Sequence, residues 1–327
     1  MHLGFFENKK ILITGASGLI GSSLRSRLNG VKCELLCHTR KNKRTNFKNG
    51  RSVETWKMLP LGIPSFWPQL LDEFEPDIIF HLAAQTSHYE ANANISKSVI
   101  LNTLPIATLI DYLNQRKIFP TLITAGTATQ VGLSENLPVS EKEKDLPTTI
   151  YDITKLSAEL LTSFYSSLEG NSGCTLRLCN VFGYSENMQH TDRGVLNKFI
   201  TKALNSEKIE IYGHGNYLRD YVYINDVIDA FLMAAENPKS VSGKAYLVGS
   251  GIKTSLLEVA QIIVSLANKT YDSKTSIEHK IIKNENSIDF RNFVADTRLI
   301  KNDIGWVAKT KLDEGIAETM KIIWDCK

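Results

Sequence analysis

The sequence predicts an α/β fold, a doubly wound parallel sheet with a smaller, interleaved C-terminal substrate domain. Through the first half of the 327 residues, short apolar runs alternate with helical patterns. That alternation requires parallel strands connected by crossover helices. A glycine-rich turn, with Gly15, Gly18 and Gly21 at three-residue spacing, joins the first of these strands to the first helix. Doubly wound sheets bind dinucleotides at such a turn.

Five segments of the first half are typical of strands, namely residues 10–14, 33–39, 76–84, 120–127 and 174–183. The later ones are nearly continuous apolar runs, as expected for strands buried on both faces of a sheet. Helical spacing of apolar residues marks the segments between them, at 19–28, 102–115 and 150–168. Each predicted strand can therefore lie parallel to the next.

The pattern loosens after about residue 184. A polar stretch is followed by a helix at 195–205, and 209–237 has the pattern of a strand, a turn, a strand and a helix. No internal repeat or flexible linker separates the two halves. We therefore expect a second domain woven from late segments. The dinucleotide-binding domain would comprise residues 1–183 with about 217–243, and the substrate domain 184–216 with 244–327.

The composition is that of a soluble globular protein, with 43% apolar residues, 22% charged residues and a formal charge of +3. It gives no reason to expect a nucleic-acid partner. No apolar run approaches the roughly 18 residues of a membrane span. The five cysteines include no pair with metal-site spacing. That usage favours free thiols in a reducing cytoplasm and no bound metal.

The three glycines have separate roles in a phosphate-binding turn. Gly15 permits the tight turn, Gly18 lets the backbone approach a pyrophosphate, and Gly21 lets the helix pack close to the sheet. The helix N-terminus adds N–H donors and a positive dipole end. A turn that serves only packing is the alternative, which the flanking strand and helix disfavour. The cofactor contacts expected here are Gly15, Ser17, Gly18, Leu19, Ile20 and Gly21.

Tyr151 and Lys155 lie four residues apart in the predicted helix 150–168, so their side chains face the same way. The end of the preceding strand offers the hydroxyl of Thr127. A phenol titrates near about pH 10, so proton transfer at neutral pH needs about 4 kcal/mol, which a nearby ammonium and a cationic nicotinamide ring would help to supply. In isolation, the spacing favours a purely structural pair. With Thr127, it predicts general acid–base catalysis matched to hydride transfer.

Eight motifs in this order make the chain similar to a known family: "TGASGLIG", "PDIIFHLAA", "TAGTATQVG", "YDITK", "LRLCNVFG", "RDYVYINDV", "YLVGSG" and "DIGW". They run from about residue 13 to about 306. The chain resembles an extended short-chain dehydrogenase/reductase of the NAD-dependent epimerase/dehydratase family. The resemblance implies a Rossmann domain, a nucleotide-diphosphate sugar as substrate and a homodimer.

The same resemblance implies roles by position. Thr127, Tyr151 and Lys155 match the catalytic Ser/Thr, Tyr and Lys. Substrate contacts are expected from Thr127, Asn180, Val195, Tyr212 and Arg219, with Arg219 gripping the diphosphate. Further cofactor contacts are expected from Leu82, Ala83, Ala84, Asn102, Tyr151 and Lys155.

The end of the second strand, "ELLCHTR", bears on the choice of cofactor. Members of the family that use NAD usually have an Asp there for the ribose hydroxyls, at a place we expect near Cys37. Here His38 and Arg40 follow instead, with further basic residues at 41, 43 and 44. A basic residue can pair with the 2′-phosphate of NADP. We expect His38 and Arg40 to bind NADP(H), with NAD(H) possible.

Departures from the family pattern reduce the number of reactions that fit this chain. Ala128 and Thr129 replace the acidic pair that dehydratases of the family carry after the catalytic Thr. Pro105 replaces a glycine that is usual in the family. Asn286 stands where the family usually has a second diphosphate-binding arginine, and Lys283 and Arg291 are the candidate substitutes. We interpret the chain as an NADPH-dependent 4-ketoreductase of a 4-keto-(6-deoxy) nucleotide sugar. A nucleotide-sugar C4-epimerase is the alternative, and a non-catalytic dinucleotide sensor is a remote one.

Overall fold

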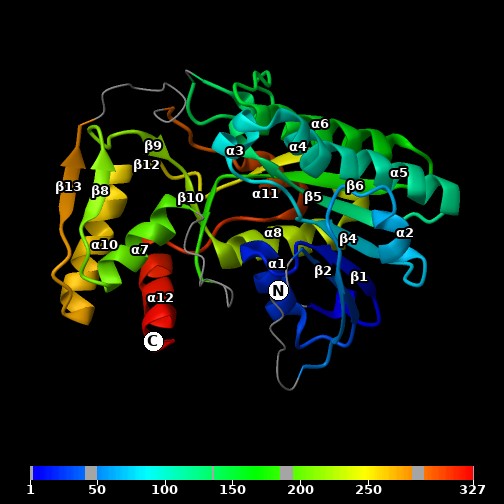
Figure 1. Ribbon diagram of the computed structural model, residues 1–327, viewed down its shortest axis with the longest axis horizontal. Helices are drawn as coiled ribbons and strands as arrows, with labels where there is room; N and C mark the ends of the chain where they lie inside the picture. Colours follow the sequence, from blue (N-terminus) through cyan, green and yellow to red (C-terminus); the bar gives the residue numbers. More distant parts are fainter. Residues whose placement is uncertain (1–2, 41–49, 135, 185–193, 282–290, 327) are drawn as a thin grey trace.

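Seven parallel strands form the central sheet of the computed structural model (Figure 1), which describes residues 3–40, 50–134, 136–184, 194–281 and 291–326. Every pairing in this sheet is parallel. The strand order is β3 (Val53–Met58), β2 (Glu34–Thr39), β1 (Lys10–Thr14), β4 (Ile78–His81), β5 (Thr121–Thr127), β6 (Ser172–Leu178) and β11 (Ala245–Val248). The order reverses between β1 and β4, the point at which doubly wound sheets bind ligands. The predicted fold class is confirmed.

Helices cover both faces of the sheet, with α1 (Leu19–Leu28) and α8 (Ile224–Glu236) on one side (Figure 1). The other face carries α2 (Phe66–Leu71), α5 (Leu104–Arg116) and α6 (Ile150–Ser167). Side chains alternate along a strand. Ile11 and Ile13 therefore enter the core under α1 and α8, and Leu12 enters the core under α2 and α5. Burying each such side chain stabilises the fold by about 1.5–3 kcal/mol.

Two edge strands differ from the expectation. No element is expected at 50–75, but residues 53–58 form β3, an edge strand whose Val53 is exposed. β11 lies at the opposite edge and pairs with β6. Residues 245–248, which follow the predicted boundary at residue 243, thus complete the large sheet. The two-domain division stays a prediction.

The remaining strands form three two-stranded sheets beside the large one. They pair β7 (Asn180–Phe182) with β10 (Tyr221–Tyr223), β8 (Ile209–Tyr212) with β13 (Ile277–Lys280), and β9 (Leu218–Arg219) with β12 (Thr254–Ser255). The helices α7 (Val195–Leu204), α10 (Leu256–Tyr271) and α12 (Leu312–Asp325) pack together at the same end of the molecule (Figure 1). Only β9 and β12 run antiparallel among these pairs.

Short helical elements complete the described chain. They are η1 (Leu3–Phe6), α3 (His88–Ala93), α4 (Ile95–Ser98), the π-helical η2 (Val99–Thr103), η3 (Ala128–Val131), α9 (Pro238–Val241) and α11 (Arg298–Ile304). Pro105 lies in the first turn of α5, where a missing N–H costs no hydrogen bond. The helix α6 begins where the Thr149 side chain accepts a hydrogen bond from the Asp152 N–H at 3.1 Å.

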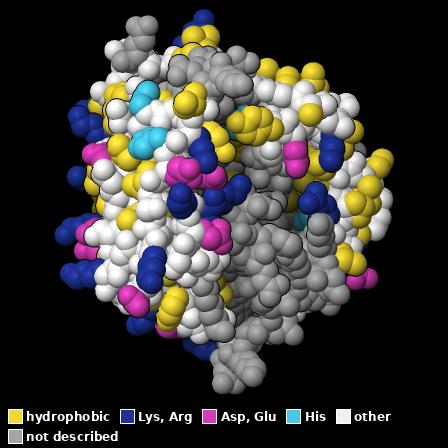
Figure 2. Space-filling view, turned by 60° about the vertical axis from the view of Figure 1, so that its left-hand side comes forward, with side chains coloured by type: hydrophobic (Ala, Val, Ile, Leu, Met, Phe, Trp, Pro, Cys, Tyr) yellow, Lys and Arg dark blue, Asp and Glu magenta, His cyan; other side chains and the backbone are white. Residues whose placement is uncertain are grey.

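Basic and acidic side chains are interspersed on the face shown in Figure 2. A mixed face of this kind lacks the field of one sign that attracts a polyanion. Among the residues that the structure describes, none of the helices is both long and apolar enough to span a bilayer.

Candidate active site

The glycine turn after β1 leaves no room for a side chain at Gly15 or Gly21. Gly15 has a φ of +69°, and a Cβ there would lie 3.0 Å from the Ala83 nitrogen. A Cβ on Gly21 would lie 2.4 Å from the Gly15 oxygen, so α1 packs directly on the turn. The first intrahelical bond of α1 runs from the Ser22 N–H to the Gly18 oxygen at 2.9 Å, ahead of which first-turn N–H groups point outward. This cradle fits the pyrophosphate of a dinucleotide.

The chain after β4 forms a wall beside the glycine turn. The N–H groups of Leu82 and Ala83 both donate to the Thr14 hydroxyl at 3.1 Å, which ties this segment to the end of β1. Asn102 is buried in η2, where its oxygen accepts from the Gln85 N–H at 2.8 Å. Its amide donates to the Thr154 hydroxyl at 3.0 Å, which joins this wall to α6. Cofactor contacts by residues 82–84 and Asn102 stay predictions.

The side chain of His38 contacts the backbone of the glycine turn. The ring is buried, with Nε2 2.9 Å from the Leu59 carbonyl oxygen and Nδ1 3.4 Å from the Gly15 nitrogen. Because a carbonyl can only accept, Nε2 carries the proton and Nδ1 accepts from the Gly15 N–H. Burial lowers the pKa of His38, which keeps the ring neutral. His38 therefore shapes the turn, and its direct contact with a ribose stays a prediction.

The residue at the end of β2 is Thr39, whose hydroxyl lies 2.9 Å from that of Ser17 in the glycine turn. Arg40 follows and is exposed. Cys37, near which the family's acidic residue is expected, is fully buried in the core, and burial raises its pKa to about 12. Its equivalence to that residue stays a prediction. A neutral hydroxyl followed by a cation thus occupies this end of the strand. The basic residues 41, 43 and 44 lie outside the described residues.

The three predicted catalytic residues come together between β5 and α6. Thr127 ends β5, Tyr151 lies in the first turn of α6, and Lys155 lies one turn further on. Burial raises the pKa of Tyr151 to about 12, a hydrogen bond with Thr127 acts to lower it, and the charge of Asp152 raises it. Burial lowers the pKa of Lys155 to about 8, against the opposing charge of Glu159. Their catalytic roles stay predictions.

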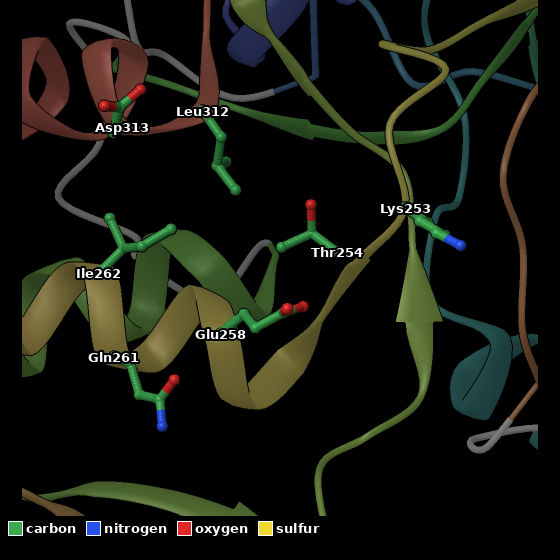
Figure 3. A pocket seen from close by; sticks show the side chains of 7 residues that line it. All are labelled: Lys253, Thr254, Glu258, Gln261, Ile262, Leu312 and Asp313. Carbon is green, nitrogen blue, oxygen red and sulfur yellow. The ribbon is translucent and has the colours of Figure 1, made fainter.

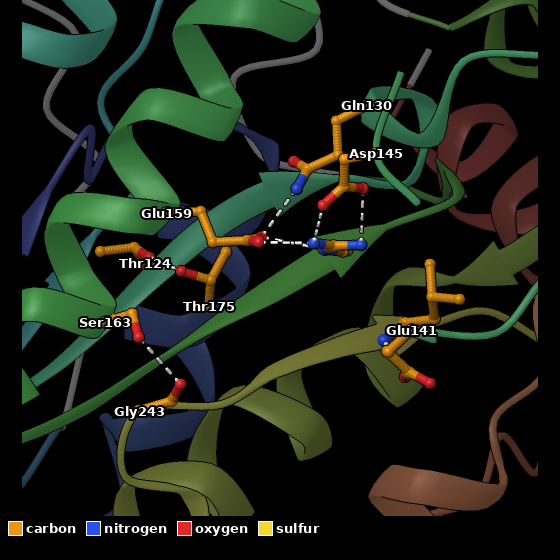
Figure 4. Close-up of polar contacts among 10 residues, drawn as sticks. Thr124, Gln130, Glu141, Asp145, Glu159, Ser163, Thr175 and Gly243 are labelled. Carbon is orange, nitrogen blue, oxygen red and sulfur yellow. Dashed lines mark hydrogen bonds and ion pairs between the residues drawn. The ribbon is translucent and has the colours of Figure 1, made fainter. Parts of the chain in front are cut away.

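A buried ion-pair network braces α6 against the sheet (Figure 4). Arg177 on β6 donates from Nε to Glu159 at 2.9 Å, and its Nη groups donate to both oxygens of Asp145 at 3.0 and 2.7 Å. Gln130 of η3 also donates to Glu159, at 2.9 Å. Glu159 lies four residues after Lys155 on the same helix. The network therefore links β6, η3 and the loop before α6 to the helix that carries Tyr151.

Besides Thr127, the predicted substrate residues lie on β7, α7, β8 and β9. The Asn180 amide donates to the Asp220 carbonyl oxygen at 3.1 Å. Arg219, half-buried, donates to its neighbour's carbonyl at 3.1 Å and to the carbonyl of Arg291. Val195 begins α7 and Tyr212 ends β8, and both are exposed. Lys283 and Asn286 lie outside the described residues, so of the residues considered for the second arginine only Arg291 is seen beside Arg219.

Two groups of residues near the site are not among the predicted ones. Asp152 is buried beside Tyr151, and Arg291 Nη1 lies 3.9 Å from its Oδ2. Asp220 is fully buried and accepts hydrogen bonds from Ser250, Gly251 and Ala295. In the sequence, both residues could have been singled out as an acid inside an otherwise apolar or catalytic motif, in "YDITK" for Asp152 and in "RDYVYI" for Asp220.

A cavity of about 450 Å³ lies apart from the catalytic residues, between β12, α10 and α12 (Figure 3). Its lining is Lys253, Thr254, Glu258, Gln261, Ile262, Leu312 and Asp313. Glu258 is already engaged in capping α10, where it accepts from the Ser255 N–H at 2.6 Å. The cavity includes none of the predicted site residues.

Comparison with known proteins agrees with the resemblance. Residues 11–249 match the sequence model described as "NAD dependent epimerase/dehydratase family". A dTDP-L-rhamnose 4-epimerase from Burkholderia thailandensis is 25% identical over 97% of this chain and 96% of its own length. UDP-glucose 4-epimerase from Thermotoga maritima, solved with UDP-glucose, has a TM-score of 0.81 at 24% identity, covering 97% of this chain and 99% of that one.

A structure solved with NADPH is also similar. RMD from Pseudomonas aeruginosa, complexed with NADPH, has a TM-score of 0.74 at 20% identity, covering 97% of this chain and 100% of that one. At these identities the two structural likenesses show the fold alone.

Proposed function

The chain belongs to the NAD-dependent epimerase/dehydratase family of nucleotide-sugar enzymes, and from that premise we propose that it is an NADPH-dependent reductase of a 4-keto-(6-deoxy) nucleotide-diphosphate sugar. The family uses NAD(H) or NADP(H). The nucleotide sugar is the substrate class of the relatives. The reduction and the NADPH preference are the parts proposed for this chain.

The observation that carries the proposal is the end of β2. The hydroxyls of buried Thr39 and of Ser17 lie 2.9 Å apart there, and Arg40 follows, exposed. β2 has its single carboxylate, Glu34, at its first residue, the opposite end of the strand. A carboxylate at the cofactor end would repel the 2′-phosphate, and a cation can pair with it. One charged hydrogen bond of this kind contributes about 1.5–3 kcal/mol, roughly ten- to a hundredfold in affinity.

The side chains of the site have separate tasks in the proposed reduction. Bound NADPH supplies the hydride. Tyr151 gives its proton to the C4 oxygen of the substrate, and Thr127 positions that oxygen. Lys155, whose pKa of about 8 leaves it largely charged at neutral pH, holds the cofactor side of the site and favours the tyrosinate that results. Arg219 and Asn180 hold the diphosphate.

A nucleotide-sugar C4-epimerase is the second candidate, and the relatives favour it, because the Burkholderia and Thermotoga proteins carry that name. Such an enzyme would use the same three catalytic residues. It would take a hydride from C4 and return it to the same carbon, with no net consumption of cofactor.

We further propose a homodimer in a reducing cytoplasm. Ile153, Leu160 and Phe164 lie on one stripe of α6 and are 44%, 62% and 55% exposed, which supports a contact with a second copy. All five cysteines are free thiols, as a reducing compartment would keep them.

Isotope transfer should distinguish the two reactions. NADPH with deuterium at the transferred position, incubated with a panel of 4-keto-6-deoxy nucleotide sugars, should place one deuterium on the product sugar for each NADPH consumed. Mass spectrometry of the product measures the label. An interconversion of two 4-hydroxy sugar nucleotides without label, together with NAD retained by the purified protein, would establish the epimerase and refute the reductase.

Replacing Arg40 with alanine should weaken binding of NADPH by about tenfold or more and leave NADH binding nearly unchanged, because only NADPH carries the 2′-phosphate. Fluorescence titration with both cofactors measures the two affinities. Arg51→Ala, which removes another exposed arginine, is the matched control and should change neither. Equal loss for both cofactors, or an unaltered preference, would contradict the assignment of Arg40.

A further inference from the structure

The π-helical turn η2 and the proline that follows it contact the helix that carries Tyr151. The Leu104 N–H bonds to the Val99 carbonyl oxygen, five residues back, which closes a wider turn than the four-residue bond of an α-helix. Pro105 has no N–H and cannot continue this pattern of bonds. The helix α5 therefore begins a new α-helical register, with Pro105 buried in its first turn.

The same proline disfavours the alternative, an α-helix that runs without interruption into α5. In such a helix residue 105 would donate to the carbonyl of Leu101, and a proline ring at that position collides with the same carbonyl. Removing the extra residue of the π-helical turn would also rotate the residues before it by about 100° around the helix axis. Asn102 and Thr103 could not then both keep their contacts with α6. Pro105 thus favours the register in which those contacts form.

Asn102 and Thr103 both bind one residue of α6, Thr154, which is 2% exposed. The Asn102 side-chain oxygen accepts from the Gln85 N–H, so its amide nitrogen is the atom that faces α6. That amide donates to the Thr154 hydroxyl at 3.0 Å, and the Thr103 hydroxyl donates to the Thr154 carbonyl at 3.1 Å. The Thr154 hydroxyl in turn donates its single proton to the Tyr151 carbonyl at 3.0 Å.

The peptide groups held in this way belong to the predicted catalytic residues. In the α-helix α6 the Tyr151 carbonyl also accepts from the N–H of Lys155, four residues later. The Thr154 hydroxyl therefore bonds to the carbonyl that already joins these two residues. The Thr154 carbonyl, which accepts from Thr103, belongs to the same peptide group as the Lys155 nitrogen. The turn η2 thus holds the backbone at both Tyr151 and Lys155.

We propose that Pro105 and Thr154 are positioning residues: the proline selects the π-helical register of η2, and Thr154 connects that turn to the backbone of Tyr151 and Lys155. The catalytic part of this assignment rests on the proposed function. It applies equally to a reductase and to an epimerase, since both would use the same catalytic residues. A displacement of about 1 Å near a reacting group can lower a rate by about a hundredfold, so the hold on these peptide groups bears on kcat.

A second contact of Pro105 can be kept constant in the test. Its carbonyl accepts from Nε1 of the buried Trp67 at 2.9 Å, and alanine at position 105 retains that carbonyl. Pro105→Ala therefore restores the N–H and removes the ring, and leaves the acceptor for Trp67 in place.

A double-mutant cycle measured in kcat tests the assignment, on whichever reaction the isotope experiment establishes. Pro105→Ala and Thr154→Val should each lower kcat by about tenfold and leave KM for the sugar nucleotide nearly unchanged, because the predicted diphosphate contacts are untouched. The double variant should lose no more than either single variant, because both changes break the same contacts. Thr154→Ser, which keeps the hydroxyl, should retain kcat. Pro238→Ala, in the first turn of α9, is the matched control and should leave kcat unaltered.

Hydrogen exchange gives a readout that needs no substrate. Peptides covering residues 150–156 should exchange faster in Pro105→Ala and Thr154→Val than in the unaltered protein, and at the unaltered rate in Pro238→Ala. Unchanged kcat in the single variants, losses that multiply in the double variant, or unchanged exchange of this segment would overturn the assignment. If Pro105→Ala does not fold, Thr103→Val takes its place in the cycle, because it removes the other contact of η2 with Thr154. Failure of the label-transfer experiment would refute the proposed reduction without altering the exchange result, so the two failures are distinguishable.

Discussion

Replacing Tyr151 with phenylalanine should lower kcat on the substrate by about two orders of magnitude or more, the usual loss for a general acid–base group. The ring keeps its packing at the start of α6, so the free energy of unfolding and the cofactor affinity should change little. Steady-state kinetics, with cofactor titration and chemical denaturation of the same preparations, measure the three quantities.

Tyr165→Phe is the matched control, because Tyr165 lies on the same helix and donates to the Pro120 carbonyl at 2.7 Å, far from Thr127. It should leave kcat unchanged and cost about 1 kcal/mol of stability through the lost hydrogen bond. Near-full activity of the Tyr151 variant would show that the proton comes from another group.

Replacing Arg177 with methionine should lower the free energy of unfolding by about 3–5 kcal/mol, because two carboxylates then lose their shared partner inside the protein. Arg177 and Glu159 are 5% and 8% exposed, and Asp145 is 21% exposed. Gln130 alone cannot neutralise Glu159. Urea denaturation monitored by circular dichroism measures the change through its midpoint.

Arg27→Met provides the comparison. Arg27 pairs with Asp229 at 2.6 Å, but the two side chains are 31% and 24% exposed. Exposed pairs contribute about 0–1 kcal/mol, so this variant should lose much less stability than Arg177→Met. A similar loss in both variants would mean that burial of the Arg177 network does not set its contribution.

The large sheet and the glycine turn could be predicted because their signals are local. Continuous apolar runs identify buried strands, and the turn needs glycine at fixed positions. The strand β3 could not be predicted, because Val53–Met58 is an edge strand that mixes exposed and half-buried side chains. Its position in the sheet depends on pairing with β2, and the local sequence gives no signal of that pairing.

The exact residue at the cofactor end of β2 could not be predicted for a related reason. Counting from the glycines requires the length of the connection after α1, which the pairing of Thr14 with His38 fixes in the structure. Cys37, His38 and Thr39 are all buried there. Asp152 was missed because an acid in a first helical turn is normally a solvated residue that favours the dipole. Its ion-pair partner in the structure, Arg291, lies far along the chain.

The hydrogen bonds of Asp220 have a consequence for how the protein folds. This carboxylate accepts from residues 30, 31 and 75 positions later in the chain, at Ser250, Gly251 and Ala295. Such high contact order makes closure of the loops a late and entropically costly event. β11, the last strand of the large sheet, ends just before the first of these partners. The N-terminal lobe of a nascent chain therefore remains an incomplete folding unit until the C-terminal segments have been synthesised.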